Sequence, residues 1–249
     1  MNTRSFAIAG AILLAAAACR DDTESPTGPT GTVSDAELAV STNTWIARRD
    51  LWSNQMSRFT TAMIPNASGQ SILYVIGGAT ATDRSLSKVM AYDVAANRWA
   101  AKASLPLPLR GTNGAGVIDG KIYVSGGRAG YRYYPGRLFV YDPAADTWTR
   151  KRDLPITGFD GVSGVIDNKL YVVTSCYDAE DCFYFGEYGL PPGHPDRWLF
   201  RYDPRTDTWT ELAIPPRVSL PEGGTIGGKL YVAHAESSVL DVYDPATDT

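Results

Sequence analysis

The segment Tyr-Asp-Pro-Ala-Ala-Asp-Thr-Trp at residues 141–148 decides the fold, because close variants of it recur along the chain. It reads Tyr-Asp-Val-Ala-Ala-Asn-Arg-Trp at 92–99, Tyr-Asp-Pro-Arg-Thr-Asp-Thr-Trp at 202–209 and Tyr-Asp-Pro-Ala-Thr-Asp-Thr at 243–249. The leading tyrosines are 49, 61 and 41 residues apart. A period near 50 residues indicates a structural unit that cannot bury its apolar face alone and therefore stacks on copies of itself.

The upstream half of each unit repeats as two β-rich runs around a two-residue turn. It reads Val-Ile-Asp-Gly-Lys-Ile-Tyr-Val at 117–124, Val-Ile-Asp-Asn-Lys-Leu-Tyr-Val at 165–172 and Thr-Ile-Gly-Gly-Lys-Leu-Tyr-Val at 225–232. Asp-Gly, Asp-Asn and Gly-Gly tolerate positive φ, which tight hairpin turns require. Each unit therefore predicts four strands: strand a, a tight turn, strand b, a variable loop, strand c ending at Tyr-Asp, a turn, and strand d beginning at Trp.

This order, a hydrophobic residue before Tyr-Val-x-Gly-Gly, then Tyr-Asp, then Trp, resembles the kelch repeat over roughly residues 44–249. The third and fourth units lack the glycine pair and have Thr174-Ser175 and His234-Ala235 near it. The resemblance implies an all-β, kelch-type β-propeller with about four four-stranded blades and loops on two faces. Four blades lie at the low end for propellers, so we expect an incomplete ring that further blades would extend. Asn43-Thr44-Trp45 resembles a lone strand d that would close such a ring.

The N-terminus predicts an export signal. Arg4 precedes an apolar run from Phe6 to Ala18, and the run ends Ala-Ala-Ala-Cys. That ending resembles a bacterial lipobox, which implies lipidation of Cys19; ordinary cleavage nearby stays open, because Ala16 stands where a lipobox usually has leucine.

We therefore expect three segments: a signal peptide at 1–19, a flexible tether at 20–42 rich in Thr, Pro, Gly and Asp, and propeller blades at 43–249. The predicted location is the bacterial cell envelope, in the periplasm or at the outer membrane or cell surface, with a lipid anchor as the link to the membrane.

The chain contains three cysteines. Lipidation of Cys19 would leave Cys176 and Cys182 in one loop, where an oxidising compartment permits a disulfide; two free or buried thiols are the alternative. Neither has a histidine or a second cysteine pair at ligand spacing, so we expect no metal site and no cofactor. The net charge of −4 gives no electrostatic footprint for nucleic acid.

Two loops between strands b and c are candidates for binding. About 24 residues separate these strands in the third unit, and long loops on a rigid scaffold are often functional. The loop of the second unit is aromatic and basic, with Arg128, Tyr131, Tyr133 and Tyr134. Such side chains suit a protein or glycan partner, although they are equally able to cover the edge of their own blade.

Arginines near the start of strand a form a second candidate site. Arg58, Arg110 and Arg217 follow the connection from the preceding strand d. The resemblance implies that these connections share one face with the b–c loops and that the arginines reach an axial pocket. There they would hold an anionic group, with partial compensation by acids such as Asp160. The alternative is that each arginine bonds local carbonyls or a neighbouring acid.

Three functions remain in view. A non-catalytic, exported module that binds a protein or glycan, anionic in character, is favoured because no acid–base pair, nucleophile or metal set stands out. The alternative is a carbohydrate-active enzyme resembling kelch-type sialic acid epimerases, in which Glu222 or Glu236 would be the acid or base. A copper oxidase of the galactose oxidase kind is more remote, because it needs two histidine ligands and this chain has only His194 and His234, neither in a ligand motif.

Overall fold

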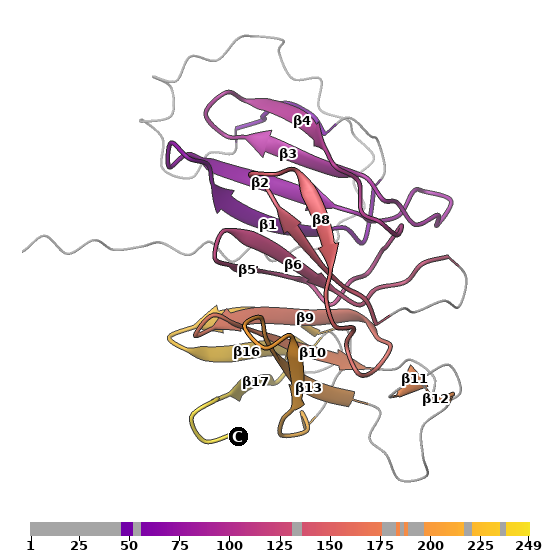
Figure 1. The fold of residues 1–249 in the computed structure, drawn as a ribbon, viewed down its shortest axis with the longest axis vertical. Coiled ribbons are helices and arrows are strands. Elements are labelled where there is room, and N and C mark those ends of the chain that lie inside the picture. Colours follow the sequence, from indigo (N-terminus) through magenta and orange to yellow (C-terminus); the bar gives the residue numbers. More distant parts are fainter. Residues whose placement is uncertain are drawn as a thin grey trace, which may run out of the picture. The chain divides into compact units, whose positions relative to one another are not determined.

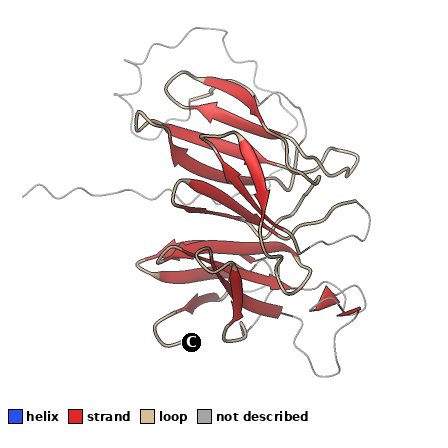
Figure 2. Ribbon diagram, viewed as in Figure 1, coloured by secondary structure: helices blue, strands red, loops and turns tan. Residues whose placement is uncertain are grey.

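The computed structural model describes residues 46–51, 56–130, 136–175, 183–184, 187–188, 197–216, 221–234 and 238–249. Residues 47–249 form one compact unit. The regular elements drawn in Figure 2 are all strands. In this part of the chain no helix is long and apolar enough to cross a membrane.

The strands, most of which are labelled in Figure 1, group into blades. Blades 1 and 2 are four-stranded antiparallel sheets in the orders β1-β2-β3-β4 and β5-β6-β7-β8, and blade 3 has the order β14-β13-β10-β9. Blade 4 has three strands among the described residues, in the order β15-β16-β17, and β11 and β12 form a separate small hairpin. The bounds are β1 (Thr60–Pro65), β2 (Ser71–Ile76), β3 (Val89–Asp93), β4 (Arg98–Lys102), β5 (Ala115–Ile118), β6 (Lys121–Ser125), β7 (Leu138–Asp142), β8 (Thr147–Arg150), β9 (Phe159–Ile166), β10 (Lys169–Ser175), β11 (Phe183–Tyr184), β12 (Glu187–Tyr188), β13 (Arg197–Asp203), β14 (Thr208–Glu211), β15 (Pro221–Ile226), β16 (Lys229–His234) and β17 (Leu240–Tyr243).

The turns between strands a and b have the predicted left-handed backbone. The φ angles are 49° at Asp119 and 69° at Gly120, and 50° at Asp167 and 55° at Asn168. Gly227 and Gly228 have φ of 57° and 78°. Two consecutive positive φ values match the right-handed twist of the flanking strands, so these residues fix the register of each hairpin.

Apolar layers between consecutive blades form the core. Successive residues of a strand point to opposite faces of its sheet, so a central strand contributes to two layers. In β6, Val124 belongs to the layer between blades 1 and 2, whereas Tyr123 belongs to the layer between blades 2 and 3. A third layer, which includes Leu199 and Leu230, joins blades 3 and 4. This double burial explains why the central strands are almost continuously hydrophobic.

One polar contact recurs between blades, and we call it the blade clasp. Asp146, in the turn after strand c of blade 2, accepts hydrogen bonds from the Tyr141 hydroxyl at 2.5 Å and from the Ala103 amide of blade 1 at 2.9 Å. The Trp148 indole returns a hydrogen bond to the Ala103 carbonyl at 2.8 Å. These bonds lower the pKa of Asp146, with the Tyr141 hydroxyl as the largest cause.

The bonds to the Asx side chain recur in the other blades, and the tryptophan bond recurs in blades 1 and 3 through Trp99 and Trp209. Asn97 takes the role of Asp146 in blade 1, and Asp207 and Asp248 take it in blades 3 and 4. All four have a left-handed backbone, with φ between 47° and 54°. Asn97, Asp207 and Asp248 also accept a hydrogen bond from a backbone amide in the segment before their own blade. These amides belong to Arg49, Arg152 and Ala213, respectively. The repeated Tyr, Asx and Trp of the sequence are therefore the parts of one inter-blade contact.

Substitutions of Asp146 test the clasp. Asp146→Ala removes the acceptor of two hydrogen bonds and should lower the free energy of unfolding by about 1–2 kcal/mol. Asp146→Gly also lacks the acceptor but relieves the left-handed backbone, so it should cost somewhat less than Asp146→Ala. Asp146→Asn should cost clearly less, since Asn97 performs this role in blade 1. Urea unfolding followed by tryptophan fluorescence measures all three, and equal losses for Asn and Ala would refute the role of the acceptor.

Candidate functional site

The starts of strands a and the b–c loops meet at one end of blades 1 and 2, and we call this end the loop face. Arg110 and Arg128 exchange two backbone hydrogen bonds there, at 3.1 and 2.8 Å. Ser57 and Ala79 do the same in blade 1, at 3.1 and 2.7 Å. The two kinds of connection therefore lie side by side in these blades, as the resemblance implied.

A chain of backbone hydrogen bonds links three blades across the loop face. The Gly111 amide donates to the Arg58 carbonyl at 2.8 Å, and the Asp160 amide donates to the Gly111 carbonyl at 2.7 Å. The φ angles of these residues are 52° at Arg58, 51° at Gly111 and 49° at Asp160. Equal φ and equal hydrogen bonds show that they occupy one position in successive blades.

This register corrects the alignment of the arginines. The sequence placed Arg58 and Arg110 at one repeat position, but Arg110 forms the bridge that Ser57 forms in blade 1. The two arginines are thus one residue apart in the repeat. Left-handed backbone is common for Asp and Asn, as in the clasp, but uncommon for arginine, so Arg58 is the residue of the two whose backbone marks it as a candidate.

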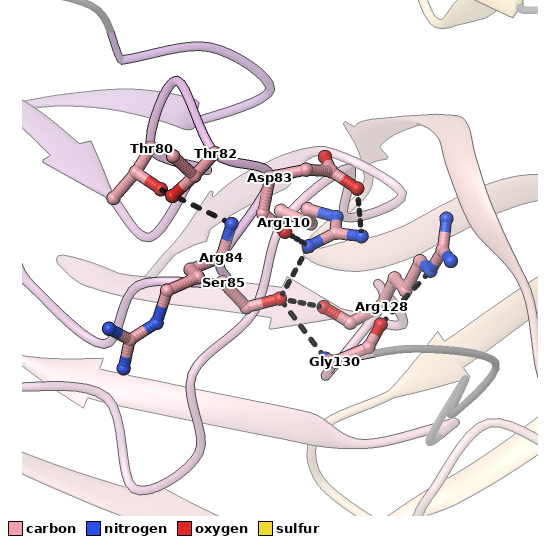
Figure 3. A network of polar contacts seen from close by, with 8 residues as sticks. All are labelled: Thr80, Thr82, Asp83, Arg84, Ser85, Arg110, Arg128 and Gly130. Carbon is pink, nitrogen blue, oxygen red and sulfur yellow. Dashed lines mark hydrogen bonds and ion pairs between the residues drawn. The ribbon is translucent and has the colours of Figure 1, made fainter.

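The Arg110 side chain reaches the b–c loop of blade 1 (Figure 3). Its guanidinium donates through Nη2 to Oδ2 of Asp83 at 2.6 Å and through Nη1 to the Asp83 main-chain carbonyl. The Arg110 side chain is 3% exposed and that of Asp83 is 61% exposed. For Arg110, the structure matches the alternative of a neighbouring acid.

Ser85 connects this loop to the next one. Its hydroxyl donates to the Arg128 carbonyl at 2.9 Å and accepts from the Gly130 amide at 3.2 Å. Nη1 of Arg110 lies 3.4 Å from the same hydroxyl oxygen. Nε of Arg128 bonds the Gly130 carbonyl at 3.0 Å, so this arginine stays at its own loop (Figure 3).

Asp160 is a second acid near these arginines. Its half-buried position raises the pKa of the carboxyl group, and the charges of Arg58, Arg110 and Arg128 partly oppose this rise. A Cβ atom at Gly111 would lie 2.2 Å from Oδ1 of Asp160, so only glycine fits there. The Arg58 side chain is exposed and available to a partner in solution.

A cavity of 590 Å³ opens beside Arg110. Its polar wall comes from the b–c loop of blade 1 and its apolar wall from the connection into blade 2. The lining residues are Thr82, Asp83, Arg84, Ser85, Leu107, Pro108, Arg110, Ala129 and Gly130. The sequence analysis did not single out Asp83, Arg84 or Ser85. Their place directly after Gly77-Gly78, in a short b–c loop, was the available signal.

Several candidates lie outside the described residues, and their roles stay predictions. They are Cys19, Tyr131, Tyr133, Tyr134, Cys176, Cys182, His194, Arg217 and Glu236. Glu222 is exposed on β15. His234 is buried, and its Nε2 lies 3.0 Å from Oδ2 of Asp241 on the neighbouring strand of blade 4. No cluster of three His, Cys, Asp or Glu suited to a metal ion occurs among the residues that the structure describes.

Comparison with known proteins agrees with this architecture. Residues 109–155 match the Kelch motif family. Among solved structures, the chain is similar to "Structure of YjhT", with a TM-score of 0.59 and 17% sequence identity over 76% of this chain and 62% of that chain. The chain thus spans less than two thirds of that protein. A search of curated proteins gives no significant match. The fold is a β-propeller, with four blades among the residues that the structure describes.

Titration of Asp160 tests the electrostatics of the loop face. Because Arg58 favours the ionised carboxyl group, Arg58→Ala should raise the pKa of Asp160 further. Carbon-13 NMR of the side-chain carboxyl measures the pKa, and Arg205→Ala, in the turn after β13, is the control. An unchanged pKa in Arg58→Ala would contradict the assignment.

The raised pKa of Asp160 also predicts how stability depends on pH. A group whose pKa is higher in the folded state stabilises the protein below its unfolded pKa of about 4, and this stabilisation is lost as the pH rises through the folded-state pKa. Asp160→Asn should therefore flatten the pH dependence of the free energy of unfolding.

Proposed function

We propose that this protein is an exported kelch-repeat module that binds a protein or glycan through its loop face, with a preference for anionic partners. The main support is the clustering of arginines on this face of a chain whose net charge is −4. Arg58, Arg110 and Arg128 act on Asp160, and Arg84 and Arg110 line the cavity. A local positive field on a negative protein attracts an anionic partner to that one face. Kelch propellers generally mediate protein interactions, which supports this class of function.

A carbohydrate-active enzyme is the second candidate, and Asp160 favours it. A carboxyl group whose pKa is raised keeps its proton at higher pH, as a general acid requires. Arginines beside it suit a carboxylated sugar, as in the kelch-type sialic acid epimerases that the sequence resembles. The copper oxidase alternative gains no support from His234, whose ring contacts Asp241.

The same proposal includes export and a lipid anchor at Cys19. The apolar run that ends in Ala-Ala-Ala-Cys supports it, and the polar segment at 20–42 would hold the propeller away from the membrane. A tethered propeller can turn its loop face towards partners in the envelope.

Charge reversal on the loop face tests the binding proposal. The double variant Arg58→Glu, Arg84→Glu should lose at least about tenfold in affinity for anionic glycans or peptides, because two attractive charges become repulsive. Arg98→Glu with Arg205→Glu, exposed residues at the turns between strands c and d, is the matched control. Surface plasmon resonance against acidic and neutral panels measures both. Equal losses in the control, or an absence of binding to every acidic member, would refute the proposal.

The same purified protein and ligands distinguish the enzyme from the non-catalytic binding module. Proton NMR of any acidic sugar that binds, recorded before and after incubation, shows conversion if it occurs. Asp160→Asn should then abolish conversion while binding persists.

Anchoring is tested on the full chain expressed in a bacterium. The N-terminal peptide of membrane-extracted protein should begin at Cys19 and carry the mass of a lipid, and Cys19→Ser should move the protein to the soluble fraction. Mass spectrometry and fractionation give these results. An unmodified peptide that spans Ala18 and Cys19 would refute the anchor.

A further inference from the structure

We infer that the cavity lined by Asp83 and Arg110 is a binding site for an organic carboxylate, and that the Asp83 carboxylate takes the place of the ligand's carboxylate at Arg110 as an internal, displaceable substitute. The inference rests on the proposed function, since it gives the loop face a ligand chemistry and a place. It starts from the unequal burial of the two partners. The Arg110 side chain is 3% exposed, whereas that of Asp83 is 61% exposed.

A buried guanidinium requires an anionic partner, because an unpaired charge out of water is very costly. In the pair between Arg137 and Asp153, by contrast, the two side chains are about equally exposed, at 28% and 30%. In the Arg110 pair the cation is fixed in the protein and the anion stands at the solvent. The fixed member is thus the one that an outside carboxylate would use.

The loop that holds Asp83 keeps its shape without the carboxylate. The Thr80 amide donates to the Arg84 carbonyl at 3.0 Å, and the Asp83 amide donates to the Thr80 carbonyl at 2.9 Å. The Thr80 side-chain oxygen also accepts from the Arg84 amide at 3.2 Å. These bonds close the turn around Asp83, whose φ is 59°. The side chain can therefore rotate away while the turn stays intact.

Such a rotation would free only one side of the guanidinium. Nη1 of Arg110 would keep the Asp83 main-chain carbonyl and the Ser85 hydroxyl, while Nη2 would lose Oδ2 of Asp83. An incoming carboxylate oxygen would accept from Nη2 in the position that Oδ2 of Asp83 takes in the structure. At Nη2 one carboxylate oxygen replaces another, while the displaced Asp83 carboxylate stays on the exposed loop, where solvent screens its repulsion of the ligand.

The cavity has room for the rest of such a ligand. Its volume of 590 Å³ lies within the range of small-molecule sites. Leu107, Pro108 and Ala129 offer an apolar wall opposite the hydroxyls of Thr82 and Ser85. In Figure 3 the Arg84 side chain extends away from Arg110, so it contributes positive charge at the rim rather than a second contact to the same group.

Chemical rescue tests the site without knowledge of the natural ligand. Asp83→Gly suits the left-handed backbone and removes the side chain that acetate replaces atom for atom. The variant should melt at a lower temperature than the wild type. Acetate at 50–100 mM should raise its melting temperature by about 3 °C, which neutral acetamide and chloride at equal ionic strength should not do. The wild type should respond far less, because Asp83 competes at high effective concentration.

Asp153→Ala is the control, because it removes an acid that pairs with Arg137 and Arg150, whose side chains are both more exposed than that of Arg110. Nitrogen-15 NMR of the arginine side chains in Asp83→Gly is the second readout, in which acetate should shift the Arg110 signals. An equal acetate response in both variants, or an unmoved Arg110 signal, would overturn the site. Loss of the acetate response with retained binding to acidic panel members would refute this inference alone, whereas rescue without panel binding would refute the proposed partner and keep the site.

Discussion

The side chain of one left-handed Asx residue per blade carries the contact on which the propeller depends. In blade 2 the side-chain oxygen of Asp146 accepts hydrogen bonds from a tyrosine hydroxyl of its own blade and from the Ala103 amide of the preceding blade. The Trp148 indole donates a hydrogen bond to the carbonyl of the same Ala103. These bonds hold the ring centroids of Tyr141 and Trp148 5.0 Å apart, where both rings pack against the apolar layer between the blades. Polar contacts at the blade margin thus set the spacing at which the apolar layers close.

At the loop face, backbone hydrogen bonds rather than Asx side chains connect the blades. Its backbone is held by a chain of hydrogen bonds through Arg58, Gly111 and Asp160, which keeps two residues other than glycine in left-handed conformations. Its charges are then distributed between one buried arginine with an exposed acid and one half-buried acid near three arginines. Neither acid is fully neutralised by contacts with its own blade. This arrangement suits a surface whose charges are meant to meet a partner.

The sequence predicted most of the fold because the repeat is local. The a–b turns at Asp119-Gly120 and Asp167-Asn168, and the role of Tyr-Asp-to-Trp as a turn with aromatic anchors, follow from spacings of a few residues. The candidate site was less predictable. The partner of Arg110 is 27 residues away in a loop with no repeat signature, and a one-residue shift in register decides which arginine lies at the left-handed position. Such contacts depend on tertiary geometry that a single sequence does not record.

The position of the clasp affects which parts of such a chain can diverge in sequence during evolution. The turn that forms the clasp lies at one end of strand c, and the b–c loop lies at the other. The Asx bonds of the clasp recur in all four blades, yet the b–c connection ranges from 5 residues between β16 and β17 to 21 between β10 and β13. Insertions and deletions in these loops therefore leave the clasp itself untouched. The architecture separates the part that must stay constant from the part that can diversify, which makes the loops natural positions for grafting new recognition segments.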